Sequence, residues 1–166
     1  KAISEALYIA NSGRKGPVLV DMPKDVLINE SEYKLPKTIS LPNYIDEPKP
    51  NKKAYAEFKS KLLNSKKPVL IFGRGSCYEE NIKKISLILK RHKIPALTSL
   101  LSLGLVNEKN TFGMIGAGGS ISASKLIEKT DHIISIGCDI SKILPKKILS
   151  KKSMSVIDID KTLLDS

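Results

Sequence analysis

From Lys52 onward, the spacing of apolar residues switches repeatedly between a helical period and short continuous runs. This alternation constrains the fold more than any other feature of the chain, because each switch marks a helix followed by a strand. The predicted helices are 52–64, 79–92, 120–129 and 142–149, and the predicted strands are 69–72, 94–98, 132–136 and 155–159. Strands joined through helices form a parallel sheet that helices cover on both faces. The sequence therefore predicts an α/β domain with a doubly wound parallel sheet.

The first thirty residues predict a helix-strand remnant of a preceding domain. Apolar residues at helical spacing indicate a helix over residues 2–11, and Val18 to Val20 indicate a buried strand that Pro23 ends, because proline cannot donate to a ladder. Residues 31–50 contain four prolines among polar residues, which is typical of an extended linker. We therefore expect three parts: residues 1–30 as the end of one domain, 31–50 as a linker, and 51–166 as a nucleotide-binding domain.

Composition excludes several classes of protein. Apolar residues make up 41% of the chain, which argues against disorder, and no apolar run approaches the roughly 18 residues of a membrane span. The net charge of +11 suggests nucleic acid as a partner, but the lysines are scattered and aromatic residues make up only 5%. We therefore expect solvated lysine faces, no nucleic-acid partner and no membrane partner.

Compartment follows from weaker features. Cys77 and Cys138 lie far apart without a CxxC motif or a histidine cluster, which predicts neither a disulfide nor a metal site and favours a reducing compartment. The chain begins at Lys1 within a predicted helix, so it reads as a piece of a longer protein with no visible targeting peptide. The cytoplasm is the expected location, with an organelle left open.

Five segments rich in glycine or acid are candidates for a ligand site, because ligands of such sheets bind outside the carboxyl ends of the strands. They are residues 73–75, 99–104, 113–120, 137–139 and 158–160. Glycine amides at a helix N-terminus favour phosphate, and an acid can accept hydrogen bonds from a ribose. Together they predict a nucleotide-shaped cleft. Taken singly, Gly73-x-Gly75 is also explained as a tight turn without a ligand, because Tyr78 stands where a dinucleotide fingerprint has its third glycine.

Residues with the usual catalytic side chains are best interpreted as structural. His92 falls in the last turn of a basic helix, and His132 begins a buried strand. Cys77 lies near a helix N-terminus, which favours the thiolate, but no base is paired with it in the sequence. No nucleophile elbow, HExxH motif or P-loop is present in the sequence, so no catalytic residue is expected within it.

Two groups of motifs resemble one enzyme family. Residues 12–26 contain Ser-Gly-Arg-Lys-Gly-Pro, then an apolar run, then Asp-x-Pro. Residues 67–160 contain, in order, Gly-x-Gly, Ile-Pro, Ser-Leu-Leu-Ser-Leu-Gly, Gly-Met-Ile-Gly, a strand ending in glycine, and Asp-Ile-Asp. The whole resembles the thiamine-diphosphate enzymes of the acetolactate synthase group, from the end of the pyrimidine-binding domain through the Rossmann-like central domain.

The resemblance implies an activity that the complete enzyme would have. Family members condense two 2-oxo acids, pyruvate with pyruvate or with 2-oxobutanoate, and release carbon dioxide in branched-chain amino-acid biosynthesis. They use thiamine diphosphate and magnesium. By the resemblance, the catalytic glutamate precedes Lys1 and the diphosphate-binding motif follows Ser166. This part of the enzyme is then expected to be inactive alone and to have no metal site.

The resemblance also implies FAD on the central domain, extended and without a redox role. Carried over by position, Lys24 lies near the substrate entrance. The flavin contacts carried over are Arg14, Gly73, Arg74, Gly75, Ser99, Leu100, Ile115, Gly116, Ala117, Gly118, Gly137, Cys138, Asp139, Asp158 and Ile159.

The chain departs from the family at two of these segments. The family has Gly-Met-His-Gly where this chain has residues 116–119, Gly-Ala-Gly-Gly, and it has Gly-x-Arg-Phe-Asp-Asp-Arg where this chain has Gly-Cys-Asp-Ile-Ser-Lys from residue 137. The histidine and both arginines are lost, and lysine does not reproduce the planar fork of arginine. We therefore expect the adenine end of a flavin site to be kept better than the ring end.

Partners and alternative interpretations follow from the same resemblance. It implies contacts with the remaining domains of the same chain, assembly as a homodimer or tetramer, and a regulatory subunit as a candidate partner. Two other hypotheses stay open: a flavin-free scaffold domain of another thiamine-diphosphate decarboxylase or a degenerate relative, and an unrelated nucleotide-binding module.

Overall fold

The computed structural model describes residues 1–32, 34, 36–42, 44, 48–107 and 109–164. The chain divides into two compact units, Lys1–Lys49 and Pro50–Ser166, which are considered separately below. In neither unit do the described residues include a helix that is both long and apolar enough to cross a membrane.

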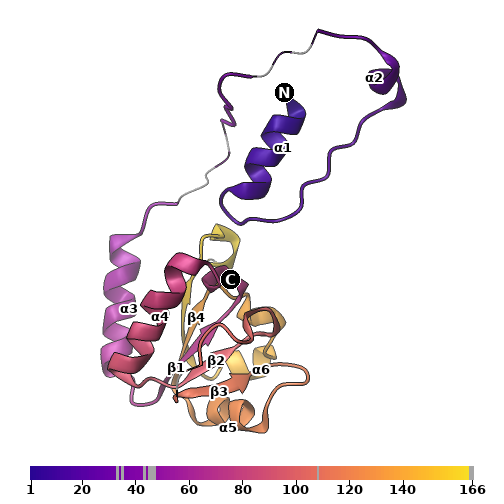
Figure 1. Cartoon of the computed structure of the whole chain (residues 1–166). Coiled ribbons are helices and arrows are strands. Elements are labelled where there is room, and N and C mark those ends of the chain that lie inside the picture. The colour runs from indigo at the N-terminus through magenta and orange to yellow at the C-terminus, as the bar shows by residue number, and fades with distance from the viewer. Residues whose placement is uncertain (33, 35, 43, 45–47, 108, 165–166) are drawn as a thin grey trace. The chain divides into compact units, whose positions relative to one another are not determined.

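The described residues of the first unit form two helices, α1 (Ala2–Asn11) and α2 (Lys24–Ile28) (Figure 1). Tyr44 packs against α1: its hydroxyl donates to the Ser12 carbonyl at 3.0 Å, and its ring meets the Tyr8 ring edge-on, with centroids 6.1 Å apart. The predicted linker thus includes a residue that returns to the first helix. Other linker positions, residues 33, 35, 43 and 45–47, lie outside the described residues.

The predicted helix over residues 2–11 is confirmed, but the predicted buried strand at residues 18–20 is wrong. That segment has no strand structure, and the Val18 and Leu19 side chains are 39% and 88% exposed. A strand needs a neighbour to satisfy its backbone groups, and the described part of this unit offers none. The five-residue helix α2 was not predicted.

The second unit is built on a five-stranded sheet. Its elements are helices α3 (Lys52–Asn64), α4 (Glu79–His92), α5 (Ile121–Lys129) and α6 (Lys146–Leu149), and strands β1 (Pro68–Phe72), β2 (Ala96–Thr98), β3 (Thr111–Met114), β4 (His132–Ile136) and β5 (Ser153–Ile157). The strand order is β3-β2-β1-β4-β5, and every pairing is parallel. This confirms the predicted α/β class.

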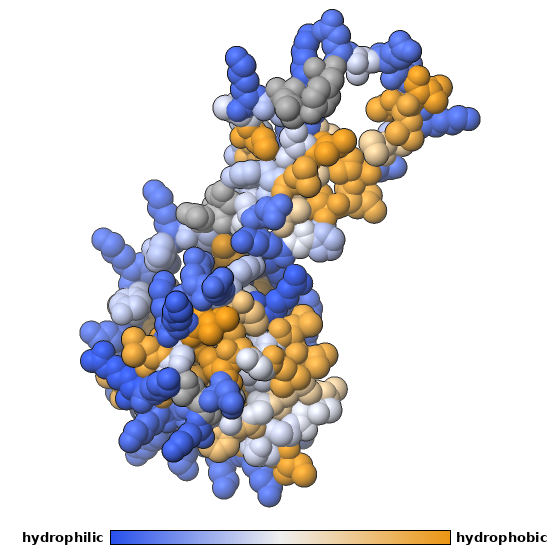
Figure 2. Space-filling model, viewed as in Figure 1, coloured by the Kyte–Doolittle hydropathy of each residue, from blue (hydrophilic) through white to orange (hydrophobic). Residues whose placement is uncertain are grey.

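Two apolar layers cover the sheet because alternate residues of each central strand point to opposite faces. In β1, Val69 and Ile71 join the cluster formed with α5 and α6, whereas Leu70 and Phe72 join the cluster formed with α3 and α4. Figure 1 shows α3 and α4 lying together on one side of the sheet. The outer surface on that side is mostly hydrophilic, as Figure 2 shows.

Several elements differ from prediction, and two of the differences have a local cause. The edge strand β3 was missed because its sequence contains Gly113 and runs into a glycine-rich segment, which is typical of a loop. Gly113 adopts a positive φ of 91° within the strand. The predicted helix 142–149 is a 3₁₀ turn, Ile140–Lys142, followed by α6, because Pro145 lacks the N–H that a continuous helix requires. The last strand both begins and ends two residues earlier than predicted, and β2 begins at Ala96 rather than at residue 94.

Candidate functional site

The five segments predicted to carry a ligand site lie at the carboxyl ends of the five strands. One backbone hydrogen bond just beyond each pair of neighbouring strands extends the ladder into these loops. In each bond, 2.9 Å long, a backbone N–H donates to a carbonyl of the neighbouring strand. The donor and acceptor pairs are Ile115 and Thr98, Ser99 and Phe72, Gly73 and Ile136, and Gly137 and Ile157. The loops therefore form one continuous row, which we call the carboxyl rim.

At the centre of the carboxyl rim, the loops after β1 and β4 touch through their backbones. The Gly75 N–H donates to the Gly137 carbonyl at 2.9 Å. A Cβ atom added to Gly73 would lie 2.2 Å from the Gly137 oxygen, and one added to Gly75 would lie 2.8 Å from Gly137 Cα. These glycines are thus required for packing of one loop on another. The Gly75 amide serves that contact and is not available to a phosphate.

The glycine-rich segment before α5 folds into a tight turn. Gly119 donates to the Gly116 carbonyl and Ser120 to the Met114 carbonyl, both at 2.9 Å. The Ser120 hydroxyl caps α5 by accepting the Ala123 N–H at 3.2 Å. Residues 117 and 118 are exposed at the tip of this turn. The tip, rather than the capped helix end, is the part of the segment that a ligand can reach.

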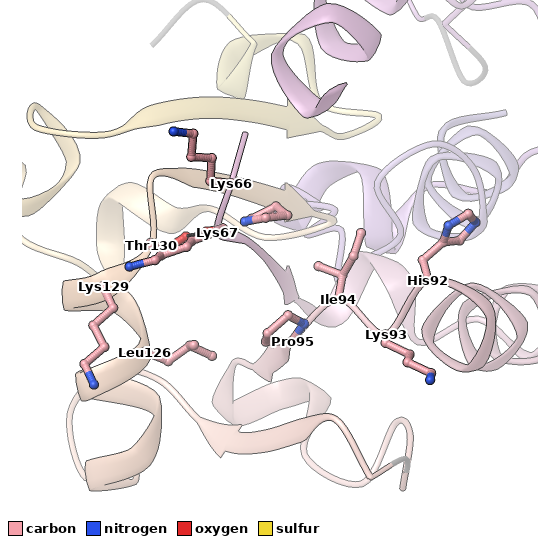
Figure 3. A pocket seen from close by; sticks show the side chains of 10 residues that line it. Lys66, Lys67, His92, Lys93, Ile94, Pro95, Leu126, Lys129 and Thr130 are labelled. Carbon is pink, nitrogen blue, oxygen red and sulfur yellow. Dashed lines mark hydrogen bonds between the residues drawn. The ribbon is translucent and has the colours of Figure 1, made fainter. Parts of the chain in front are cut away.

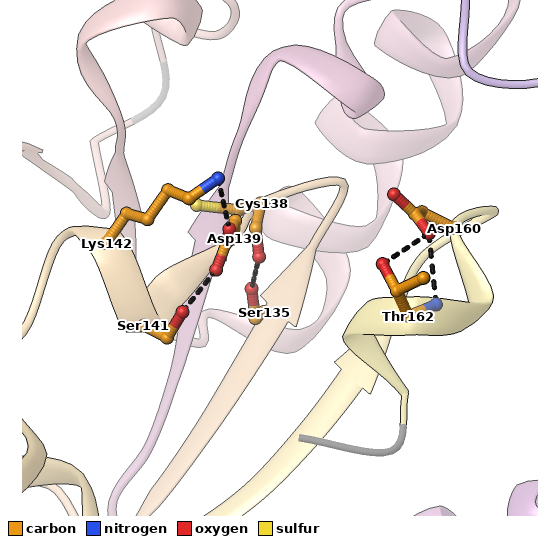
Figure 4. A network of polar contacts seen from close by, with 7 residues as sticks. All are labelled: Ser135, Cys138, Asp139, Ser141, Lys142, Asp160 and Thr162. Atoms are coloured by element: carbon orange, nitrogen blue, oxygen red, sulfur yellow. Dashed lines mark hydrogen bonds and ion pairs between the residues drawn. The ribbon is translucent and has the colours of Figure 1, made fainter.

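The loop after β4 carries a polar network around Asp139 (Figure 4). Its carboxylate accepts the Ser141 hydroxyl at 2.5 Å and pairs with the Lys142 ammonium group at 3.0 Å. These two partners, the Ser141 bond first, lower the pKa of Asp139. Asp139 stands where the family motif has its first arginine, and the charge of Lys142 is directed at this carboxylate of its own loop.

Cys138 is buried beside this network and is not a reactive thiol. Burial, with smaller contributions from the Asp139 and Asp158 charges, raises the pKa of Cys138 to about 11. Its carbonyl accepts the Ser135 hydroxyl at 2.7 Å. The protonated side chain packs in the apolar layer with Ile140 and Leu144.

The loop after β5 presents two carboxylates. Asp158 accepts the Asp160 N–H at 2.9 Å, and Asp160 accepts the N–H and hydroxyl of Thr162 at 3.0 and 2.7 Å. The Asp158 bond involves Oδ1, and the side chain is half-buried beside Cys138, whose pKa it raises. Asp158 therefore remains suited to accept a ribose hydroxyl.

The loop after β2 adds an apolar surface. Ser99 and Ser102 cap its 3₁₀ turn reciprocally, and Ser102 also donates to the Phe72 carbonyl at 2.6 Å. These bonds hold Leu100 and Leu101 outward, with exposed fractions of 67% and 68%. Leu101 was not among the predicted contacts. The signal that could have identified it is the run of leucines directly after a buried strand.

Two of the predicted contacts belong to the first unit. Arg14 follows α1, and Lys24 is the first residue of α2. Both belong to Lys1–Lys49, so a shared site with the predicted residues of the second unit stays a prediction.

The histidines and the remaining cysteine contribute little to the rim. His132 is buried at the opposite ends of the strands, where its Nε2 lies 2.9 Å from the Ser155 hydroxyl. Burial raises the pKa of Cys77, and Arg74 opposes this rise, which agrees with the structural interpretation of this cysteine. Cys77 donates weakly to the carbonyls of Gly73 and Leu101.

A pocket of about 450 Å³ opens at the amino ends of the strands, on the rim opposite the predicted site (Figure 3). Lysines supply much of its lining, and sequence reasoning did not predict it. These lysines lie in segments that are distant in sequence, so only the fold assembles them.

The carboxyl rim fits one end of a dinucleotide better than the other. An exposed glycine turn, the Asp158 carboxylate and the exposed leucines match the phosphate, ribose and flat rings of a nucleotide. The Asp139–Lys142 pair leaves no free cation in that loop for a flavin ring or a carboxylate.

Comparison with known proteins gives consistent matches. Residues 56–165 match the family described as thiamine pyrophosphate enzyme, central domain. The chain is 32% identical over 165 residues to the acetolactate synthase large subunit of Lactococcus lactis, covering 96% of this chain and 29% of that protein. It is 34% identical over 139 residues to the large subunit of Corynebacterium glutamicum, covering 82% and 22%. It is also 34% identical over 141 residues to the large subunit of Cyanidium caldarium, covering 81% of this chain and 24% of that protein. The chain thus spans less than a third of these relatives' length.

Proposed function

The chain belongs to the thiamine pyrophosphate enzymes, whose central domain it contains, and from this premise we propose that it is the central segment of an acetolactate synthase catalytic subunit. The observation that carries the proposal is its 32–34% identity to large subunits of that enzyme. The complete protein would condense pyruvate with a second 2-oxo acid and release carbon dioxide.

We propose that other parts of the complete protein hold thiamine diphosphate and magnesium. Within residues 1–32, 34, 36–42, 44, 48–107 and 109–164, no three histidine, cysteine or acidic side chains gather as metal ligands. Thiamine diphosphate supplies the electron sink for decarboxylation. The role left to this chain is to hold a nucleotide and to support neighbouring domains in a homodimer or tetramer.

For the carboxyl rim we propose weak binding of FAD, mainly through its adenosine diphosphate part. The turn at residues 116–119 would face the phosphates, and Asp158 would accept a ribose hydroxyl. Leu100 and Leu101 would offer apolar contact to a ring. Bound there, the nucleotide would tie together loops from three strands and stabilise the rim.

The activity is tested with the complete protein that carries this chain. Supplied with thiamine diphosphate, Mg²⁺ and pyruvate, it is expected to produce acetolactate and carbon dioxide, while residues 1–166 alone produce neither. Formation of acetaldehyde without acetolactate would support another decarboxylase of the family instead. Calorimetric titration of residues 1–166 with thiamine diphosphate and Mg²⁺ is expected to show no binding.

The nucleotide site is tested by quenching of flavin fluorescence and by competition with ADP. We expect both ligands to share one site, and Asp158→Asn to weaken both about tenfold, because a hydrogen bond to a charged acceptor is lost. The amide oxygen can still accept the Asp160 N–H, so the loop is preserved. Glu128→Gln, near the end of α5, is the matched control and should leave both affinities unchanged.

A scaffold without flavin is the second candidate function, and the Asp139–Lys142 pair favours it. This ion pair neutralises the only cation of the 137–142 segment. If neither FAD nor ADP binds the complete protein at millimolar concentration while acetolactate still forms, the rim is a support for the other domains.

A further inference from the structure

The pocket at the amino ends of the strands, here called the amino-rim pocket, has an apolar floor. Pro68, Ile94, Pro95 and Leu126 form it, and each is half-buried. They come from the starts of β1 and β2 and from the last turn of α5. A volume of about 450 Å³ is within the range of ligand-binding pockets.

Four exposed lysines surround this floor: Lys66, Lys67, Lys93 and Lys129. Their side chains extend in different directions around Ile94 and Pro95, as Figure 3 shows. Ammonium groups that diverge in this way cannot converge on one small anion. They suit a ligand whose negative charges are spread over its length.

The lysines are not neutralised by partners in the described part of the chain. No ion pair there joins any of the four to a carboxylate. Asp131 accepts the backbone N–H groups of Lys66 and Lys67 at 2.8–3.1 Å and the Ser65 hydroxyl. Its carboxylate is thus engaged in fixing the loop that carries two of the lysines.

Lys93 is held in a conformation that disfavours lysine. It ends α4 with φ 54° and ψ 22°, and it is the one residue other than glycine with positive φ in the described chain. Glycine is the usual residue at this position of a helix end, because it adopts positive φ without strain. A strained residue that adds a fourth charge to the pocket is explained more readily by binding than by stability.

Charge distribution indicates the sign of the partner. Residues 50–166 contain 21 Lys and Arg against 10 Asp and Glu, whereas residues 1–49 contain seven of each. The whole net charge of +11 therefore belongs to the unit with the pocket. Because few aromatic residues are present, stacking on nucleic-acid bases is not favoured, and a phosphate polymer would leave the apolar floor unused.

We propose that the amino-rim pocket docks an extended acidic segment of a partner protein, with carboxylates on the four lysines and apolar side chains on the floor. Alternation of charged and apolar side chains in the partner would match the arrangement of ammonium groups around a recessed apolar surface. The pocket lies on the rim opposite the proposed nucleotide site, so this proposal does not depend on the proposed function and is tested separately from it.

The test is fluorescence anisotropy with the full 166-residue chain and a labelled peptide of sequence Glu-Glu-Leu-Glu-Glu-Leu-Glu-Glu. We expect saturable binding that weakens as salt rises, because partly exposed charge pairs are screened. Replacing the leucines of the peptide with serine should weaken binding, and replacing its glutamates with glutamine should abolish it. Equal binding of the serine peptide would overturn the apolar part of the proposal.

Charge reversal locates the site. Lys66→Glu with Lys129→Glu should weaken peptide binding about tenfold or more, because like charges are then placed together. Lys83→Glu with Lys84→Glu, on the exposed face of α4, changes net charge equally and should have an effect of less than about twofold. Equal losses in the two double variants would mean that only the overall charge binds the peptide, and the proposal would fail.

Lys93→Gly separates binding from folding. It should weaken peptide binding while leaving the melting temperature unchanged or higher, because it removes both a charge and the positive-φ strain. Tighter competition by duplex DNA or by anionic vesicles than by unlabelled peptide would assign the pocket to that class of partner instead. Competition by inorganic phosphate alone would reduce it to a small-anion site.

Discussion

Gly73, Gly75 and Gly137 allow the loops after β1 and β4 to pack backbone to backbone. Gly73 has φ −111°, an ordinary value, so its requirement for glycine is purely steric. Gly137 has φ +60° and is crowded as well, because an added Cβ would lie 2.5 Å from the Gly75 carbonyl carbon. Gly104 has φ +79° but open space around it. Gly73 therefore shows steric crowding alone, Gly104 shows the strain of positive φ alone, and Gly137 combines the two.

We predict that Gly73→Ala lowers the free energy of unfolding by about 2–3 kcal/mol, since a methyl group is forced into a packed backbone contact. Gly104→Ala should cost only about 1 kcal/mol, the strain of positive φ without a clash. Urea unfolding followed by circular dichroism measures both values. An equal cost for the two variants would show that the rim loops can separate to make room.

His132 links stability to pH. It is 1% exposed, its Nδ1 has no partner in the described structure, and burial lowers its pKa from 6.5. A backbone hydrogen bond with Lys61 and the Asp131 charge oppose this effect, whereas the Lys61 ammonium group lowers the pKa further. The unfolded chain therefore binds a proton that the folded chain resists, and stability falls as pH drops below 6.5.

We predict that the melting temperature falls between pH about 7 and about 5, and that His132→Gln removes this slope, although it lowers stability overall. His92→Gln, at an exposed position, is the control and should keep the slope. The lowered pKa values of Asp131 and Asp139 mean that these carboxylates contribute stability lost only below their ordinary value of 3.8, so their effect falls outside this range. A slope that persists in His132→Gln would assign it to another group.

Among the elements, α3 depends most on its ends. None of its residues is fully buried, and it touches the sheet through the half-buried Phe58 and Leu62. Its N-terminus is fixed by Asn51, whose side-chain oxygen accepts the N–H groups of Lys53 and Ala54 at 3.0 and 3.3 Å. A helix with so little burial relies on such capping.

We predict that Asn51→Ala destabilises the second unit by about 1 kcal/mol, because two N–H groups of the first turn lose their acceptor. Asn64→Ala, at the other end of the same helix, removes the same type of side chain where the structure shows no cap bond, and it should cost less than about 0.5 kcal/mol. Thermal unfolding of the two variants compares them directly. Faster amide exchange in the first turn of α3 would locate the change.

At the scale of the whole molecule, the two units differ in how they can be stable. Pro50–Ser166 has a sheet with an apolar cluster on each face. Lys1–Lys49 has two short helices without a buried residue and exposed apolar side chains such as Leu7 and Leu19. Its apolar surface calls for a covering that its own described residues do not provide.

We predict that limited proteolysis cuts first between Asn29 and Asn51 and leaves a stable product close to residues 50–166. The helices of the first unit are too short to persist alone, whereas the second unit has a complete core. Mass spectrometry of the early products identifies the sites. Early cleavage within residues 69–136 would show that the sheet unit is not independently folded.

The sequence by itself determined the α/β class, most of its helices and most of its strands. The helical apolar period of residues 52–64 and 79–92 and the continuous apolar run at 132–136 reflect burial that any such sheet requires. It also determined the five candidate loops, since glycines and acids follow apolar runs. The edge strand β3 was not predicted, because Gly113 is a residue that strands rarely contain. A strand was wrongly predicted at residues 18–20, because an apolar run does not reveal whether a neighbouring strand is present to pair with it.

Only the tertiary structure decided what each loop does. The Gly75 N–H, which the sequence suggested as a phosphate ligand, donates instead to the Gly137 carbonyl. The Lys142 ammonium group likewise pairs with Asp139 and is not available to a ligand. The amino-rim pocket joins Lys66 with Lys93 and Lys129, which are far apart in the chain. Such contacts depend on the parallel strand order, which brings the ends of distant strands to one edge, and local spacing along the sequence carries no record of that order.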